Sequence, residues 1–214
     1  MRISDLSRRT GVPVATIKFY LRDRLLPPGK PIGRNQAEYG EAHLRRLRLI
    51  RAFTNIARLD LSTVRELLTS IEDDRIPIGD LYGVVNHAML PDEPAMPETE
   101  GVAQAHADVD AFLVSLGWRL PPDAAGRKQL ADVLAALQRL ECECGVEYFV
   151  PYAEAAERLT LLELDLLPDG GSDHADRAPA VVRAVLLEVA FTALRRLAHE
   201  HLVAQRFGAG QEPA

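Results

Sequence analysis

The basic residues of this 214-residue chain are concentrated in its first third. Residues 1–65 contain 14 Lys or Arg and 5 Asp or Glu, whereas residues 66–214 contain 11 basic and 26 acidic side chains. The net charge of −6 therefore combines a cationic N-terminal segment with an anionic remainder. Clustered positive charge attracts a polyanion, and an acidic surface repels one. The chemistry predicted for the N-terminal segment is neutralisation of nucleic-acid phosphates.

The two cysteines, Cys142 and Cys144, are the next candidates for chemistry, because thiolates bind soft metal ions. Side chains two positions apart on a helix diverge by about 200°. Two sulfurs also supply fewer ligands than a structural zinc or iron–sulfur site needs. His106 and Asp110 lie one helical turn apart but have no evident third ligand. We therefore predict no resident metal and no cofactor, and keep the cysteines as weak metal or redox candidates.

The sequence has no pattern typical of an enzyme. It contains no phosphate-binding glycine loop, no metalloprotease histidine pair and no nucleophile elbow. No apolar run reaches the ~18–20 residues that span a bilayer, and the first residues do not form a signal sequence. We expect a cytoplasmic, non-enzymatic protein without a membrane partner.

The first 26 residues predict two short helices around a tight turn. Ser4 is the expected N-cap of the first helix and Gly11 ends it. Pro13 suits the first turn of a second helix from about Val14 to Arg24. Ile17 and Leu21 recur at helical spacing and are expected to face the core. The outer faces of the second helix are left to Thr16, Lys18, Phe19, Tyr20 and Arg22. This pattern predicts a helix-turn-helix whose second helix enters the major groove.

Residues 27–35 contain three prolines and two glycines, which exclude a helix there. Lys30 and Arg34 make this segment a basic wing suited to the phosphate backbone. A third helix is expected from near Gly40, and a fourth after Leu61 with Ser62 as its N-cap.

Five segments in this order resemble the N-terminus of the mercury-resistance-type (MerR) transcriptional regulators: residues 3–12, 16–26, 35–39, 43–47 and 59–68. The resemblance covers residues 1 to about 72. It departs from the family pattern at Lys18, where the family often has Arg, at Phe19, where it has Tyr, and at Ala37 and Glu38 in the wing.

The resemblance implies a homodimer that binds a palindromic promoter element in double-stranded DNA and distorts it. RNA polymerase and a small-molecule effector are the further partners that it implies. Carried over by position, the helix-turn-helix contributes Thr16, Lys18 and Tyr20, and the wing contributes Arg34 and Tyr39. With the basic residues Arg22 and Lys30, the predicted DNA-binding set is Thr16, Lys18, Tyr20, Arg22, Lys30, Arg34 and Tyr39.

The remainder of the chain predicts an all-helical domain. Residues 73–98 are expected to form a connecting helix and a linker with three prolines at 91–97. Residues 99–214 are expected to form a dimerisation and effector domain, with helices near 102–116, 123–141, 147–167 and 176–207. The last of these is apolar on more than one side, which suggests that it packs on its own bundle and on a second subunit. The predicted fold class is mainly α.

Four aromatic residues of this domain are candidates for an effector cavity: Phe112, Trp118, Tyr148 and Tyr152. These residues can also simply fill the core of the helical bundle, and this is the interpretation that we favour. The sequence thus predicts a dimeric, sequence-specific transcriptional regulator of the MerR type. Two alternatives remain: a protein-interaction module or anti-regulator with a helix-turn-helix shape, and a metal or thiol-redox sensor acting through Cys142 and Cys144.

Overall fold

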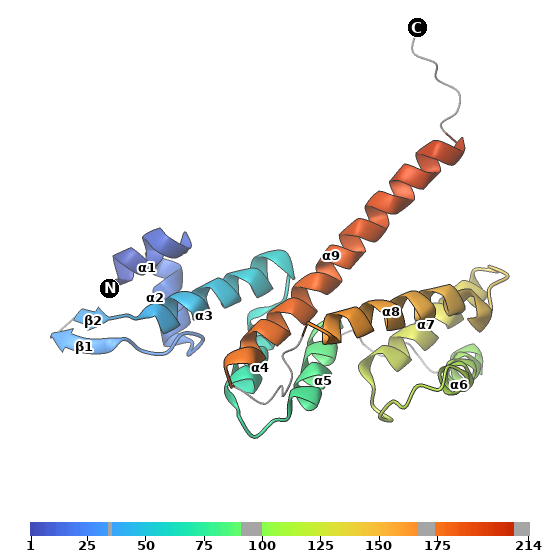
Figure 1. The fold of residues 1–214 in the computed structure, drawn as a ribbon, viewed down its shortest axis with the longest axis horizontal. Helices are drawn as coiled ribbons and strands as arrows, with labels where there is room; N and C mark the ends of the chain where they lie inside the picture. Colours follow the sequence, from blue (N-terminus) through green and yellow to red (C-terminus); the bar gives the residue numbers. More distant parts are fainter. Residues whose placement is uncertain (34–35, 91–99, 167–173, 208–214) are drawn as a thin grey trace, which may run out of the picture. The chain divides into compact units, whose positions relative to one another are not determined.

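The computed structural model describes residues 1–33, 36–90, 100–166 and 174–207, and these residues are mainly α-helical with one two-stranded sheet (Figure 1). The chain divides into two compact units. Unit 1 comprises residues 1–73 and the residues from 178 onward, and unit 2 comprises residues 74–177. The predicted proline-rich linker at 91–97 lies outside the described residues. None of the described helices is both long and apolar enough to cross a membrane.

Unit 1 contains the predicted winged helix-turn-helix. Its elements are α1 (Ile3–Thr10), α2 (Val14–Arg22), β1 (Lys30–Gly33), β2 (Gln36–Glu38), α3 (Glu41–Arg51), the π-helical turn η1 (Ala52–Ile56) and α4 (Leu61–Glu72). Most of the long helix α9 (His174–Phe207) also belongs to this unit. The fold class and the order of helices and wing match the prediction.

The turn between α1 and α2 follows from the residues at the helix ends. Gly11 adopts a left-handed φ of 69°, and its N–H donates to the carbonyl of Ser7. The start of α1 differs from the prediction, because the helix begins at Ile3 and Ser4 is not its N-cap. The carboxylate of Asp5 instead accepts the backbone N–H of Arg2 at 2.9 Å, and this hydrogen bond lowers the pKa of Asp5.

The wing is a short antiparallel hairpin rather than a loop throughout. Lys30 pairs with Glu38 and Gly33 with Gln36, with an irregularity between Pro31 and Gly33. A two-stranded sheet consists only of edge strands, which tolerate the missing N–H of Pro31. In Figure 1 the hairpin extends away from α1, α2 and α3.

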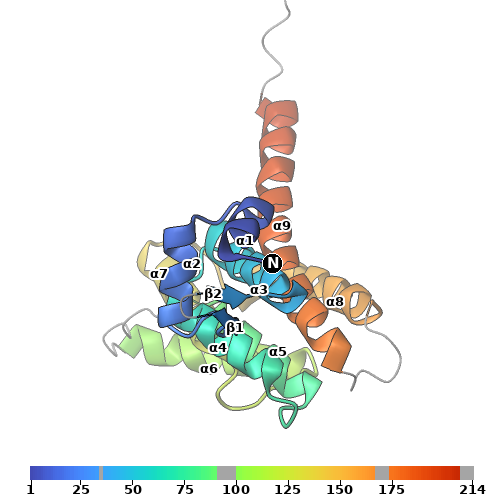
Figure 2. The ribbon, with the colours of Figure 1, turned by 90° about the vertical axis from the view of Figure 1, so that its left-hand side faces the viewer.

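The core of unit 1 joins residues that are far apart in the sequence. The helix α1 packs on α2 and α3, as Figures 1 and 2 both show. The fully buried side chains contributed by α1, α2, the segment after α2, α3, η1 and α4 include Leu6, Ile17, Leu25, Leu26, Leu44, Leu47, Ile50, Phe53, Leu67 and Leu68. The members from α3 and α4 recur at helical spacing, so each helix turns one side toward the core.

The start of α4 is fixed by Asp60, not by Ser62 as predicted. The Asp60 carboxylate accepts the backbone N–H of Ser62 at 2.7 Å and that of Thr63 at 3.1 Å, as well as both hydroxyl groups. These donors, led by the two hydroxyl groups, hold the pKa of Asp60 well below its usual range. The carboxylate satisfies amide groups that have no partner inside the helix.

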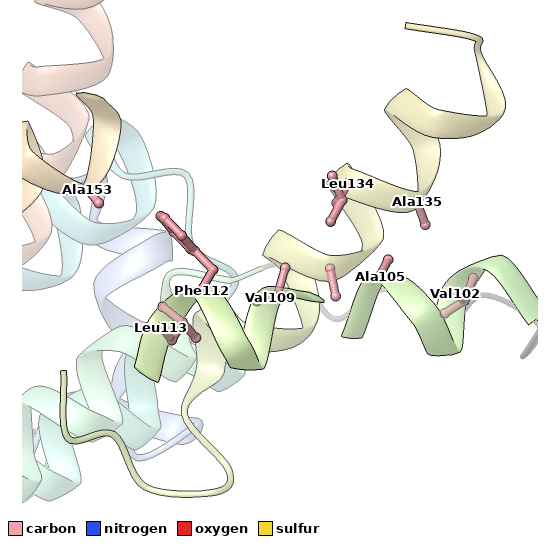
Figure 3. Close-up of a cluster of buried hydrophobic side chains, with 9 residues drawn as sticks. Val102, Ala105, Val109, Phe112, Leu113, Leu134, Ala135 and Ala153 are labelled. Atoms are coloured by element: carbon pink, nitrogen blue, oxygen red, sulfur yellow. The ribbon is translucent and has the colours of Figure 1, made fainter. Parts of the chain in front are cut away.

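Unit 2 is built from α5 (Ile78–Ala88), α6 (Glu100–Ser115), α7 (Ala125–Arg139), the 3-10 turn η2 (Val146–Phe149) and α8 (Val150–Leu164). Its buried cluster is formed mostly by α6 and α7. Figure 3 shows Val109 and Ala105 of α6 facing α7, and Phe112 pointing toward Ala153 of α8. Pro77 directly precedes α5. Its missing N–H costs the helix nothing there, because an amide at this position would have no partner inside the helix.

The pH dependence of the Asp60 cap gives a testable prediction. Replacing Asp60 with Ala should lower the free energy of unfolding by about 1 kcal/mol at pH 7. Because the folded-state pKa is depressed, the contribution is complete above the ordinary Asp value of about 4 and is lost as the pH falls below it. Urea unfolding of both proteins should therefore show a difference that shrinks in acid.

The control for this measurement is Glu66, an exposed residue within α4. Glu66→Ala should change the free energy of unfolding by less than about 0.5 kcal/mol. Equal effects of the two substitutions, or a difference that does not depend on pH, would contradict the capping role of Asp60.

Candidate nucleic-acid interface

The outer surface of α2 carries the cations that the sequence predicted there. Lys18 and Arg22 are exposed, and Thr16 is half-buried. The guanidinium group of Arg22 lies over the ring of Phe19, and the distance from Cζ of Arg22 to the ring centroid is 5.5 Å. The stacked aromatic ring limits the directions that the Arg22 side chain can take. The helix therefore offers a hydroxyl group and two positive charges at its surface.

Tyr20 is buried, in contrast to the predicted outward orientation. The residue is 8% exposed, and burial raises the pKa of its hydroxyl group. The buried residues of α2 are Ile17 and Tyr20, whereas the sequence predicted Ile17 and Leu21. The observed inner face is therefore rotated around the helix axis by a few tens of degrees from the predicted one. The Tyr20 ring thus belongs to the core of unit 1. A contact between Tyr20 and DNA remains a prediction.

The wing exposes Lys30 on β1, while Arg34 lies outside the described residues. Tyr39, the other predicted wing contact, is 7% exposed and meets the ring of His43 edge-on, with 5.2 Å between centroids. Its backbone pairs with that of Met1, because the Tyr39 N–H donates to the Met1 carbonyl at 2.8 Å. Tyr39 therefore fixes the base of the hairpin, and its contact with DNA also remains a prediction.

Gly29 allows β1 to approach β2 and Tyr39 closely. A Cβ atom at this position would lie 2.8 Å from the carbonyl oxygen of Glu38 and 2.9 Å from Cε1 of Tyr39. The first of these atoms belongs to the backbone and cannot move without separating the strands. Glycine is therefore required for close packing at the base of the wing.

The basic residues from α1 to α4, including the wing, fall into two groups that the sequence does not distinguish. In the first group, the side chains have no hydrogen bond or ion pair to another residue in the described part of the chain: Lys18, Arg22, Arg24, Lys30, Arg45, Arg48 and Arg58. In the second group, the guanidinium group binds a carboxylate or a backbone carbonyl of the same unit: Arg8, Arg9, Arg46, Arg51 and Arg65. Only the first group is available to phosphates without losing internal contacts.

The four aromatic residues proposed for an effector cavity do not share one environment in unit 2. Phe112 is in the buried cluster and Trp118 packs against it. Tyr148 and Tyr152 are 55% and 56% exposed. The effector role of this set remains a prediction.

A cavity of about 430 Å³ lies elsewhere in unit 2, among α5, α6 and the start of α7. Its lining includes His87, His106, Asp110, Asp123, Arg127 and Lys128. Arg127 forms an ion pair with Asp110 at 3.0 Å, so part of this charge is internally balanced. The cavity lining thus combines charged and apolar side chains and includes none of the four aromatic residues that the sequence suggested.

The cysteines are not assembled into a metal site by the described residues. Cys142 is exposed and Cys144 is half-buried, and both are free thiols. The Cys144 N–H donates to the carbonyl of Cys142 at 2.6 Å in the turn after α7. Among the described residues, no group of three or more His, Cys, Asp or Glu side chains could hold a metal ion.

Comparison with known proteins identifies relatives for both parts of the chain. Residues 1–71 match the model described as MerR HTH family regulatory protein. The HTH-type transcriptional regulator ZntR homolog of Haemophilus influenzae is 37% identical over 68 residues, which are 32% of this chain and 50% of that protein. This chain thus aligns with half the length of that curated relative.

One solved structure resembles the whole chain. It is the crystal structure of the proposed transcriptional regulator SCO5550 from Streptomyces coelicolor A3(2), which is 37% identical. The TM-score is 0.72, and the similarity covers 99% of this chain and 100% of that one. The similarity therefore includes the helical region beyond the helix-turn-helix.

The close approach at Gly29 predicts that Gly29→Ala will loosen the wing. The added Cβ should separate β1 from β2, lower the thermal stability of the protein and speed amide hydrogen exchange in the hairpin. Gly33→Ala is the matched control, because its nearest neighbour would be the Cβ of Gln36 at 4.0 Å. If Gly33→Ala disturbs hydrogen exchange as much as Gly29→Ala does, the proposed packing at Gly29 is not what holds the hairpin.

Proposed function

Because this chain belongs to the MerR HTH family of transcriptional regulators, we propose that it acts as a homodimer that binds a palindromic promoter element in double-stranded DNA. The observation that carries this proposal is the set of uncommitted cations on the surface of unit 1. Lys18 on α2 and Lys30 on β1 are exposed, and the elements carrying them have the order of a winged helix-turn-helix. In that fold a helix enters the major groove and the wing lies along the backbone.

Phosphate neutralisation supplies most of the affinity in this proposal. Each phosphate contact releases condensed counterions, so binding weakens as salt increases. Lys18 carries a compact charge and lacks the planar fork with which Arg reads guanine. Specificity would then come from the side chains of α2 together with the ease with which the DNA bends, including distortion between the two half-sites.

The described part of α9 supports the dimer. Phe191, Leu194 and Leu202 are exposed, and at 100° per residue they lie within about 80° of one another around the helix axis. Leu194 is 63% exposed, which is unusual for a large apolar side chain in a continuous stripe. The helix has 34 residues and is therefore about 50 Å long. We propose that this stripe pairs with α9 of a second copy, so that the dimer carries two helix-turn-helix motifs.

The proposal includes control by a small-molecule effector. The cavity of unit 2 is a better location for an effector than the dispersed aromatic residues are, because a ligand site is concave and combines apolar surface with a few polar groups.

A salt titration tests the DNA-binding function. We expect fluorescence anisotropy with a duplex selected from random sequences by the wild-type protein to show affinity that falls steeply with salt. Lys18→Ala should reduce the magnitude of the slope of log K against log salt by about one. Lys128→Ala, which removes the same charge from unit 2, should leave the slope unchanged. Absent or salt-insensitive binding would favour the protein-interaction alternative.

Sedimentation analysis tests the dimer. Leu194→Glu should raise the dimer dissociation constant by at least about 100-fold, because a two-fold interface buries each unpaired charge without compensation. Ala193→Glu, one position away and directed to another side of α9, should have a much smaller effect. A wild-type monomer at micromolar concentration, or equal effects of both substitutions, would exclude pairing through this stripe.

A further inference from the structure

Arg46 of α3 is directed into unit 1, although its charge counts toward the basic N-terminal segment. Its side chain is 13% exposed. Its Nε donates to the carbonyl of Leu25 at 2.5 Å, just beyond the end of α2, and its Nη1 donates to the carboxylate of Glu72 at the end of α4. The planar fork of the guanidinium group lets different nitrogens bind these two acceptors in fixed directions, which a single ammonium nitrogen cannot reproduce. Arg46 therefore links α3 to both α2 and α4.

Arg65 of α4 makes a second link to the same end of α2. Its Nη2 donates to the backbone carbonyl of Asp23 at 3.3 Å and to the Asp23 carboxylate. Asp23 is the C-cap of α2, where carbonyl groups have no partner inside the helix and a positive charge is favourable. The end of α2 is thus held by one arginine from α3 and one from α4.

Arg51, the last residue of α3, makes a third link, to the turn between α1 and α2. Its Nη1 donates to the carbonyl of Thr10, the last residue of α1. A Cβ at Gly11 would lie 2.9 Å from this nitrogen. The glycine therefore serves both the left-handed backbone and the approach of Arg51.

We propose that Arg46, Arg51 and Arg65 are positioning residues for the recognition helix and do not contact phosphate. This inference rests on the proposed DNA-binding function. The helix α2 has nine residues, too few to be stable in isolation, so its orientation depends on what it is attached to. Side chains that read bases must be held within a fraction of an ångström, whereas non-specific binding depends on charge alone. A residue that positions α2 should therefore affect specific binding and leave non-specific binding unchanged.

Arg46→Lys separates these two effects, because it keeps the charge and loses the fork. We expect affinity for the selected duplex to fall about tenfold, which corresponds to one lost hydrogen bond to a charged donor. Affinity for a random-sequence duplex of equal length, and the salt slope, should stay at the wild-type values. Arg158→Lys is the matched control: Arg158 lies on α8 of unit 2, is exposed, has no hydrogen bond or ion pair within the described ranges, and should show neither change.

Arg65→Gln is a second test that stays decisive even if circular dichroism shows that Arg46→Lys is poorly folded. This variant removes a charge, so a phosphate contact would lower the magnitude of the salt slope by about one, whereas an internal link would leave the slope unchanged while specific affinity falls. An unchanged specific affinity in folded Arg46→Lys, or a reduced slope in Arg65→Gln, overturns the positioning role. Failure of the wild-type protein to bind any duplex would instead overturn the proposed function on which this role depends.

Discussion

Two helices of eight and nine residues cannot present a surface to DNA unless other elements hold them. In unit 1, Leu6 and Ile17 are fully buried, and α1 packs on both α2 and α3. The hydrophobic contacts fix which side of α2 faces inward but are not directional. Guanidinium groups bound to backbone carbonyls add directional constraints at the ends of α1 and α2. The exposed cations depend on this arrangement for their positions.

The helix boundaries of unit 1 were largely predictable, because they depend on residues close in sequence. Gly11 ends α1 where the end of the first helix was expected, and α2 begins at Val14 directly after Pro13. The caps were less predictable. Ser, Thr and Asp all favour this position, and Asp60 was preferred over Ser62 because its carboxylate accepts four donors at once. The burial of Tyr20 was missed for a related reason, since a rotation of α2 by part of a turn exchanges its inner and outer residues.

The division of the arginines into exposed and internally bound groups could not be predicted from composition or local periodicity. Arg46 binds a carbonyl 21 positions earlier, and Arg65 binds one 42 positions earlier. A partial signal was present for Arg51, which falls within the inward stripe of Leu44, Leu47 and Ile50 on a helical projection, whereas Arg45 lies opposite it. Arg46 and Arg48 flank this stripe on its two sides, so the projection does not distinguish the bound arginine from the exposed one. Positive charge therefore marks the segment of the chain that matches the MerR HTH family model, but it overestimates the number of cations available to phosphates.

The central claim is that α2 and the wing bind a duplex through their exposed cations, while the internal arginines hold α2 in its orientation. A crystal structure of the protein bound to a selected duplex tests this most directly. The account predicts Lys18 and Arg22 at the major groove, Lys30 near a phosphate, and the guanidinium groups of Arg46, Arg51 and Arg65 still bound to Leu25, Thr10 and Asp23. Phosphates bound by those three arginines, or α2 lying away from the DNA, would contradict it.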